Sequence, residues 1–276
     1  MRTEGEFRAL LSLLTDEQEP VARAAWNALL ESGEEAVPHL TQAFNAPDIT
    51  LRSRVRALLE EIRMARLEER WAEYLSAPDE RLDLAKGCLL LAGITGTEVN
   101  ERQINSFIDV IAGTVRAQAA AVGGLQALGE VLFDNLGFRG GDAENPDYHF
   151  LPTVLERRRG LPIALAAVYM IVGQRAGLPV YGVAMPDHFL ALYERVDDPA
   201  YVDCFNRGQI FRYEMLHNLL SRRGVSYPEQ VLSPCSHRFM LYRMLNNLEG
   251  VYTSTENRRM TDRVRRWRAH IRVEKA

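Results

Sequence analysis

Apolar residues recur at helical spacing through the first part of the chain. Two similar stretches, PVARAAWNALLE from Pro20 and ITLRSRVRALLE from Ile49, place their apolar residues three and four positions apart, as on one face of an α-helix. The tripeptide Ala46–Asp48 lies between them and favours a turn followed by a helix cap. We therefore predict two short helical hairpins over residues 1–65.

The helical pattern continues beyond these hairpins, with a single helix predicted over residues 118–136. The next predicted helix, residues 161–177, is apolar on every side (LPIALAAVYMIV) and should be buried all round. Pro162 suits its first turn, because the N–H that proline lacks would have no partner there. Gly177 followed by Pro179 predicts its end.

Three short runs after this helix have the composition of strands: residues 180–185, 188–194 and 201–205. Pro186-Asp187 separates the first two and favours a tight turn. The tail is helical again from about Glu229. A helical core followed by an antiparallel meander predicts an α+β fold, here mostly helical. We divide the chain into helical hairpins (1–65), an α+β domain (66–255) and a C-terminal helix (256–276).

Composition narrows the possible functions. The chain has 276 residues, 47% of them hydrophobic and 25% charged, with a formal net charge of −4, so its overall charge does not attract nucleic acid or anionic lipid. The longest apolar run, Leu161–Val172, is shorter than the roughly 20 residues that cross a bilayer. The charged, amphipathic start of the chain does not have the pattern of a secretory signal. We expect a soluble cytoplasmic protein without a membrane partner.

Cysteine and histidine spacing gives no sign of a metal or a cofactor. Cys88, Cys204 and Cys235 are odd in number and far apart, unlike a disulfide framework or a zinc site. The histidines lack an HxxxH spacing. We expect reduced thiols, no metal site and no cofactor.

Several separated motifs occur in a fixed order over residues 128–208: LGEVLFDNLGFRG, RRRGLPIALAAVY, RAGLPV, PDHFLALY and VDCFNRG. In this order they resemble the transglutaminase-like superfamily, and specifically its SirB-type bacterial branch, which is related to the middle region of a eukaryotic F-box protein. The resemblance implies a transglutaminase or cysteine-protease-like core, with a buried central helix packed on a small antiparallel sheet. The N-terminal hairpins resemble HEAT-type repeats.

Active relatives of this type place a cysteine at the start of the central helix, where the helix dipole lowers the pKa of the thiol. A histidine shares the proton and a carboxylate orients the histidine. The resemblance assigns these last two positions to His188 and Asp203. Pro162, two residues after Gly160, occupies the position of the nucleophile and has no nucleophilic atom. Tyr169, a hydroxyl on the same helix, lies about 10 Å further along its axis and does not replace the thiol.

Two interpretations remain open for the site histidine. His188 either knits two strands together through Asp203, or it takes part in proton transfer or ligand binding. Cys204 is next to Asp203, but neighbouring residues of a strand point to opposite faces, so we expect its thiol to point away from His188 and to be buried. A distant cysteine, Cys88 or Cys235, remains an open alternative as the nucleophile.

The residues around the start of the central helix are candidates for a binding cleft: Gly160, Leu161, Ile163, Asp187 and Tyr148. The run Arg157, Arg158 and Arg159 precedes this helix and could contact an anion or a partner at the free N–H groups. We favour the alternative, in which these arginines pair with acidic neighbours such as Glu156, Asp142 or Asp147.

We therefore expect a catalytically inactive transglutaminase-like protein, an interaction or regulatory module whose former active-site cleft holds a protein or peptide partner. One alternative is a slow hydrolase or acyltransferase of peptides or amides that uses His188 and Asp203 with a non-cysteine nucleophile. Another is binding of nucleic acid or an acidic partner by the basic tail, which we consider less favoured than a helix that docks its stripe of Met260, Val264, Trp267 and Ile271 while its arginines stay solvated. Those arginines are Arg258, Arg259, Arg263, Arg265, Arg266, Arg268 and Arg272.

Overall fold

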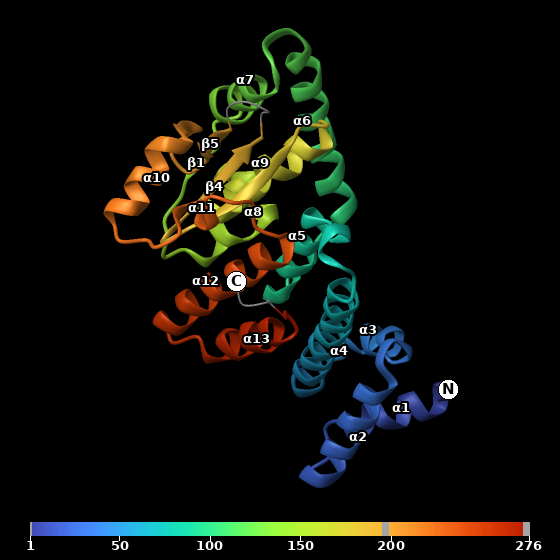
Figure 1. Cartoon of the computed structure of the whole chain (residues 1–276). Coiled ribbons are helices and arrows are strands. Elements are labelled where there is room, and N and C mark those ends of the chain that lie inside the picture. Colours follow the sequence, from blue (N-terminus) through green and yellow to red (C-terminus); the bar gives the residue numbers. More distant parts are fainter. Residues whose placement is uncertain (1, 195–198, 273–276) are drawn as a thin grey trace. The chain divides into compact units, whose positions relative to one another are not determined.

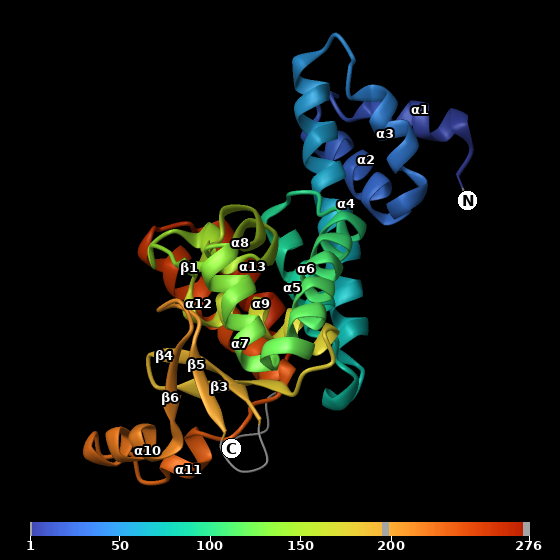
Figure 2. The same cartoon turned by 90° about the horizontal axis from the view of Figure 1, so that it is seen from above.

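The computed structural model describes residues 2–194 and 199–272. The chain divides into two compact units at the Arg70–Trp71 peptide, a smaller N-terminal one and a larger one. Figures 1 and 2 show the elements of each. Every element that bears on the candidate site belongs to the larger unit.

Helices make up the smaller unit: α1 (Glu4–Leu13), α2 (Glu19–Ser32), α3 (Val37–Ala43) and most of α4 (Ile49–Leu75). The two similar stretches of the sequence form α2 and the start of α4, as predicted. Thr3 and Glu6 cap α1 reciprocally through backbone and side-chain hydrogen bonds. The apolar faces meet in a core that includes Phe7, Leu29 and Leu58.

The larger unit is also mostly helical. Its helices are α5 (Leu84–Ala92), α6 (Glu101–Val122), α7 (Gly124–Gly129), the π-helical segment η4 (Glu130–Asn135), α8 (Leu151–Arg157), α9 (Pro162–Arg175), α10 (Tyr213–Arg222), α11 (Pro228–Val231), α12 (His237–Ser254) and α13 (Arg258–Ala269). The prediction of a single helix over 118–136 is wrong. Gly123 has φ 86° and ψ 153°, a conformation that ends α6 and redirects the chain into α7.

A four-stranded antiparallel sheet follows α9 in the chain, in the order β3 (Val180–Met185), β4 (His188–Tyr193), β5 (Ala200–Asp203) and β6 (Gln209–Arg212). The first three strands match the predicted runs to within two residues. The strand β6 and the helix α10 were not predicted, and the helical tail expected from about Glu229 is divided into α11, α12 and α13. A separate parallel pair joins β1 (Arg139–Gly140) to β2 (Arg159–Gly160), immediately before α9.

The sheet lies between two helical layers, with α9 on one face and α10 and α11 on the other (Figure 2). On the α10 side, Leu190 and Tyr201 of the sheet belong to one buried cluster with Leu216 and Leu220 of α10. On the other side, α9 is buried from Ile163 to Gly173, as its uniformly apolar sequence predicts. The mostly helical α+β class with a small antiparallel sheet is confirmed.

The C-terminal helix α13 packs on α12 within the larger unit. Trp267 is fully buried, its ring stacks on Trp71 at 5.1 Å, and its carbonyl accepts a hydrogen bond from the Trp71 indole at 3.0 Å. The prediction that all the arginines here stay solvated is wrong for Arg263, which is buried and donates to the carbonyl of Ile94 at 2.8 Å. Arg265 and Arg268 both pair with Glu249. No helix in the described ranges has an apolar stretch that could cross a bilayer.

Candidate functional site

Two neighbouring strands bring His188 and Asp203 together. β4 begins at His188 and β5 ends at Asp203. Because the strands are antiparallel, these two residues lie at the same end of the sheet. The register pairs Leu192 with Tyr201, so alternation puts His188 and Asp203 on one face. Nε2 of His188 donates to Oδ2 of Asp203 at 2.9 Å.

Asp203 is held by a loop that folds back on its carboxylate. The side chain is 6% exposed, Oδ1 accepts the backbone N–H groups of Phe205 (3.0 Å) and Asn206 (3.1 Å), and Oδ2 accepts a hydrogen bond from the Asn206 amide at 2.9 Å. Burial alone would raise the pKa of Asp203, but the hydrogen bonds from His188 and Asn206 outweigh it, so the pKa lies below its ordinary value. The carboxylate is therefore ionised at neutral pH.

The His188 imidazole is hydrogen-bonded at one ring nitrogen and has no described hydrogen-bond partner at the other. The His188 side chain is 30% exposed. Its Nδ1 hydrogen-bonds to none of the residues that the structure describes. Bound to an ionised carboxylate through Nε2, the ring presents Nδ1 as a base or an acceptor.

The start of α9 lies at this same end of the sheet. The 14 residues of α9 rise about 21 Å along its axis. The six residues of β3, which return antiparallel to α9, cover about 20 Å. Pro186 and Asp187 then turn the chain into β4, where His188 pairs with Met185 at the end of β3.

Backbone hydrogen bonds connect this helix start to the loop after Asp203. Gly141 donates to the carbonyl of Gly160 at 3.0 Å, and Gly140 donates to the carbonyl of Phe205 at 2.9 Å. The Phe205 ring meets the His188 ring edge-on, with 6.2 Å between their centroids. A Cβ at Gly140 would lie 2.6 Å from Cζ of Phe205, so this close approach requires glycine.

Pro162 is the first residue of α9, and Leu161 precedes it as the N-cap without a side-chain hydrogen bond to the helix. No thiol or hydroxyl of residues 2–194 and 199–272 hydrogen-bonds to His188. The Tyr169 side chain, on the same helix, is buried and stacks on Phe133 at 6.0 Å instead. The described site thus has a base and its orienting carboxylate, with a proline ring at the helix start.

Two of the three cysteines, Cys88 and Cys204, are buried, and Cys235 is half-buried. The Cys204 thiol is fully buried and points to the carbonyl of Val202 at 3.9 Å, and burial raises its pKa well above the ordinary value. Burial raises the pKa of Tyr169, and the nearby Cys204 thiol raises it further. Burial raises the pKa of both Cys88 and Cys235 to about 12. Each thiol is protonated at neutral pH and a poor nucleophile.

Comparison with known proteins decides the family of this fold. The family model of the transglutaminase-like superfamily matches residues 99–246, more than half of the chain. This chain belongs to the transglutaminase-like superfamily. The match covers α9, the whole sheet, His188, Asp203 and Pro162.

Two kinds of curated relative share the transglutaminase-like domain. A UPF0162 protein of Xylella fastidiosa (strain 9a5c) is 29% identical over 197 residues, 67% of this chain and 70% of that protein. Human F-box only protein 21 is 23% identical over 237 residues, 72% of this chain and 37% of that protein. The predicted relationship with a eukaryotic F-box protein is confirmed. No solved structure matches the chain.

The residues proposed for the transglutaminase-like cleft separate into two groups. Leu161 donates its N–H to the carbonyl of Tyr148 at 3.1 Å, which brings Tyr148 next to Leu161 and Gly160 at the start of α9. Asp187 is exposed, in the turn before His188, with φ 57°. Leu161 and Ile163, by contrast, are only 7% and 2% exposed and pack into the core, so neither side chain lines an open cleft.

The arginine run before α9 is exposed and partly paired. Arg157 forms an ion pair with Asp147 at 3.5 Å, the pairing that we favoured over anion binding. Arg158 has φ 56°, ends α8 and donates to the carbonyl of Leu136 at 3.1 Å. Arg159 lies in β2 and is exposed.

Sequence reasoning missed Phe205 and Asn206. Both follow Asp203 in the motif VDCFNRG, and an aspartate that ends a strand often accepts the N–H groups of the next residues. This pattern could have identified Asn206 as a partner of the carboxylate. Among the described residues, no group of three or more His, Cys, Asp or Glu side chains is placed to hold a metal ion.

Proposed function

We propose that this chain is a catalytically inactive transglutaminase-like protein that binds a protein or peptide partner at its former active-site cleft. One observation carries the proposal: Pro162 is the first residue of α9, where the nucleophile would stand, and no described thiol or hydroxyl hydrogen-bonds to His188. Without an attacking atom, acyl transfer through a covalent intermediate has no starting point.

The remaining groups suit recognition of a peptide. The first N–H groups of α9 after Pro162 lack intrahelical partners, and the positive end of the helix favours a carbonyl or carboxylate oxygen. The open Nδ1 of His188 and the partly exposed Tyr148 add a polar contact and an aromatic surface. The four hydrogen bonds of Asp203 fix the imidazole before a ligand arrives, so little conformational entropy is lost on binding.

The smaller unit fits the same role. We interpret its two helical hairpins as a HEAT-like module, since their apolar residues repeat in α2 and α4. Modules of this kind present extended surfaces to partner proteins.

A hydrolase is the second candidate, favoured by the hydrogen bond between His188 and Asp203. His188 would act as a general base for a water molecule that attacks a peptide or amide carbonyl. Such assistance gives roughly 10²–10⁴-fold acceleration, so this enzyme would be slow.

One experiment separates the two candidates. A fluorescent amine and a glutamine-containing peptide are incubated with the wild type and with His188→Ala, and both amine incorporation and amide hydrolysis are followed. Binding of the same peptide is measured by NMR from the shifts of the His188 ring. We expect no turnover and a peptide-dependent shift. Turnover that is lost in His188→Ala and kept in the control His217→Ala would establish the hydrolase and overturn the inactive assignment.

A further inference from the structure

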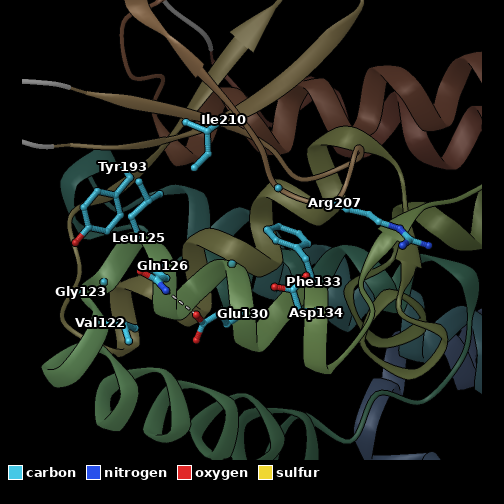
Figure 3. A pocket seen from close by; sticks show the side chains of 13 residues that line it. Val122, Gly123, Leu125, Gln126, Glu130, Phe133, Asp134, Tyr193, Arg207 and Ile210 are labelled. Atoms are coloured by element: carbon cyan, nitrogen blue, oxygen red, sulfur yellow. Dashed lines mark hydrogen bonds between the residues drawn. The ribbon is translucent and has the colours of Figure 1, made fainter.

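A second hollow lies beside β6, away from the His188 dyad. It has a volume of about 720 Å³ and is formed by the junction of α6 and α7, by η4, by the end of β4 and by the turn into β6. The register pairs Val202 with Ile210, so Ile210 and Asp203 belong to opposite faces of the sheet. Figure 3 shows Leu125, Phe133, Tyr193 and Ile210 around this hollow.

The turn between β5 and β6 is built to form one wall of the hollow. Arg207 and Gly208 have φ 54° and φ 78°, both left-handed. A Cβ at Gly208 would lie 2.3 Å from Cδ2 of Phe133, so glycine lets the turn pack directly on this ring. The wall is therefore formed by the backbone of the turn, with Phe133 as the apolar floor.

The other wall is the open edge of the sheet. β6 is the last strand, and among the described residues the backbone of Ile210 and Phe211 hydrogen-bonds to no segment other than β5. Every second residue of such an edge directs its N–H and C=O outward, where another strand can pair with them. The Ile210 side chain lines the hollow and is 50% exposed, an apolar group beside an unpaired strand edge.

Two carboxylates add negative charge beside the apolar floor of the hollow. Glu130 and Asp134 both belong to η4, and both line the hollow. Gln126 donates to Glu130 at 2.8 Å, as Figure 3 shows. Neither carboxylate pairs with a cation among the described residues, while the Arg207 side chain extends away from Glu130 (Figure 3). These two carboxylates are complementary to a lysine or arginine side chain.

We propose that β6 and this hollow bind an extended peptide segment of a partner protein as an added fifth strand of the sheet. The backbone of the segment pairs with Ile210. One of its apolar side chains packs against Phe133, Leu125 and Ile210, and a neighbouring lysine or arginine binds Glu130 and Asp134. Strand addition takes affinity from the backbone and specificity from alternate side chains, which matches an open edge beside an apolar, acidic hollow. The site goes beyond the proposed function of the His188 cleft and does not depend on it.

The test selects peptides on the intact chain. Displayed random peptides of about ten residues, the upper length of an ordinary strand, are enriched on the wild type and then measured by fluorescence anisotropy. We expect enriched sequences that alternate apolar and basic residues. Ile210→Lys and Glu130→Lys should each weaken their binding roughly tenfold or more, because both introduce a cation against a basic peptide. Methylation of the peptide backbone nitrogens should also abolish binding, because it removes the N–H groups that pair with the strand edge.

Two control variants make the result specific. Met215→Lys adds the same charge to an exposed residue of α10 and should bind the peptides like the wild type. His188→Ala should also leave their affinity unchanged, which separates this site from the dyad. The proposal is overturned if no peptide is enriched, if the enriched peptides bind Ile210→Lys and Glu130→Lys undiminished, or if backbone methylation has no effect. It is also overturned if the chain instead forms a dimer that Ile210→Lys abolishes, since the occupant would then be a second copy.

Discussion

His188 and Asp203 are hydrogen-bonded at the end of the sheet where β4 begins and β5 ends, with 2.9 Å between Nε2 and Oδ2. The same carboxylate accepts two backbone N–H groups and the Asn206 amide, so it organises the loop as well as the imidazole. At the same end of the sheet, α9 begins with Pro162, whose side chain has no nucleophilic atom. The site combines an ordered histidine–carboxylate pair with a proline at the start of the helix.

Replacement of Asp203 should destabilise the fold. Asp203→Ala leaves the N–H groups of Phe205 and Asn206 without their acceptor and removes a buried charge, so we expect the free energy of unfolding to fall by about 3 kcal/mol. Urea denaturation followed by tryptophan fluorescence measures this change. The exposed control Asp187→Asn keeps a residue that tolerates a positive φ and should change stability by less than about 0.5 kcal/mol. Equal losses in the two variants would show that the Asp203 network is dispensable.

A buried neutral histidine should make stability depend on pH. Burial lowers the pKa of His149 from 6.5 to about 4, against a smaller effect of its hydrogen bond to the Pro146 carbonyl. As the pH falls from 6.5 to 4, His149 therefore binds a proton in the unfolded chain and stays neutral in the folded chain. The contribution is fully present above 6.5 and is lost progressively down to the folded pKa, for a total of about 3 kcal/mol.

The variant His149→Phe isolates this effect. Its free energy of unfolding should change less with pH than that of the wild type over the window between 6.5 and 4, as measured by urea denaturation at several pH values. Val110→Phe, at an exposed residue without a titratable group, serves as the control and should keep the pH profile of the wild type. Parallel pH profiles for the wild type and His149→Phe would show that His149 is not the responsible group.

A thiol placed at the start of α9 should be unusually reactive. Pro162→Cys puts sulfur at the positive end of a helix next to the dyad, and both features favour the thiolate. We expect iodoacetamide to modify this cysteine at neutral pH well before Cys88, Cys204 and Cys235, whose pKa values burial raises. Peptide mass mapping over time gives the rate at each position. The double variant with His188→Ala should react more slowly; an equal rate would mean that His188 does not reach this position.

Strong burial made much of the fold predictable. The uniformly apolar run from Pro162 marked α9 correctly, because a helix buried on all sides contains no polar face. The strands β3 and β4 were found because apolar residues and a Pro186-Asp187 turn delimit them. β6 was not found, since its residues are mostly exposed and show no alternation. The helix break at Gly123 also escaped prediction, because Gly113 lies inside α6 without interrupting it and only the backbone angle separates the two cases.

The site was predictable only as far as its motifs extend. The pairing of His188 with Asp203 followed from the resemblance. Asn206 and Phe205 were missed because their contacts arise from a loop that folds back, which periodicity does not encode. Leu161 and Ile163 were expected in the cleft as part of the start of the helix, but both side chains are buried in the core.

The C-terminal helix should stabilise the larger unit through its apolar side. Trp267→Ala removes a fully buried ring that stacks on Trp71, and we expect the free energy of unfolding to fall by about 3–5 kcal/mol. Arg266→Ala, one residue earlier and exposed, should change stability by less than about 0.5 kcal/mol. Thermal and urea denaturation of both variants provide the comparison. A small loss for Trp267→Ala would mean that α13 is not part of the folded core and would revive the basic tail as a binding element.

We propose that Pro162 and three protonated cysteines leave this transglutaminase-like site without a nucleophile. The most direct measurement is amine incorporation into a glutamine-containing peptide by the wild type, by Pro162→Cys and by Pro162→Ala, at equal protein concentration. The wild type and Pro162→Ala should show no incorporation, and any activity gained should appear in Pro162→Cys alone and disappear when His188 is also replaced. Incorporation by the wild type that depends on His188 would show that the site is catalytically active.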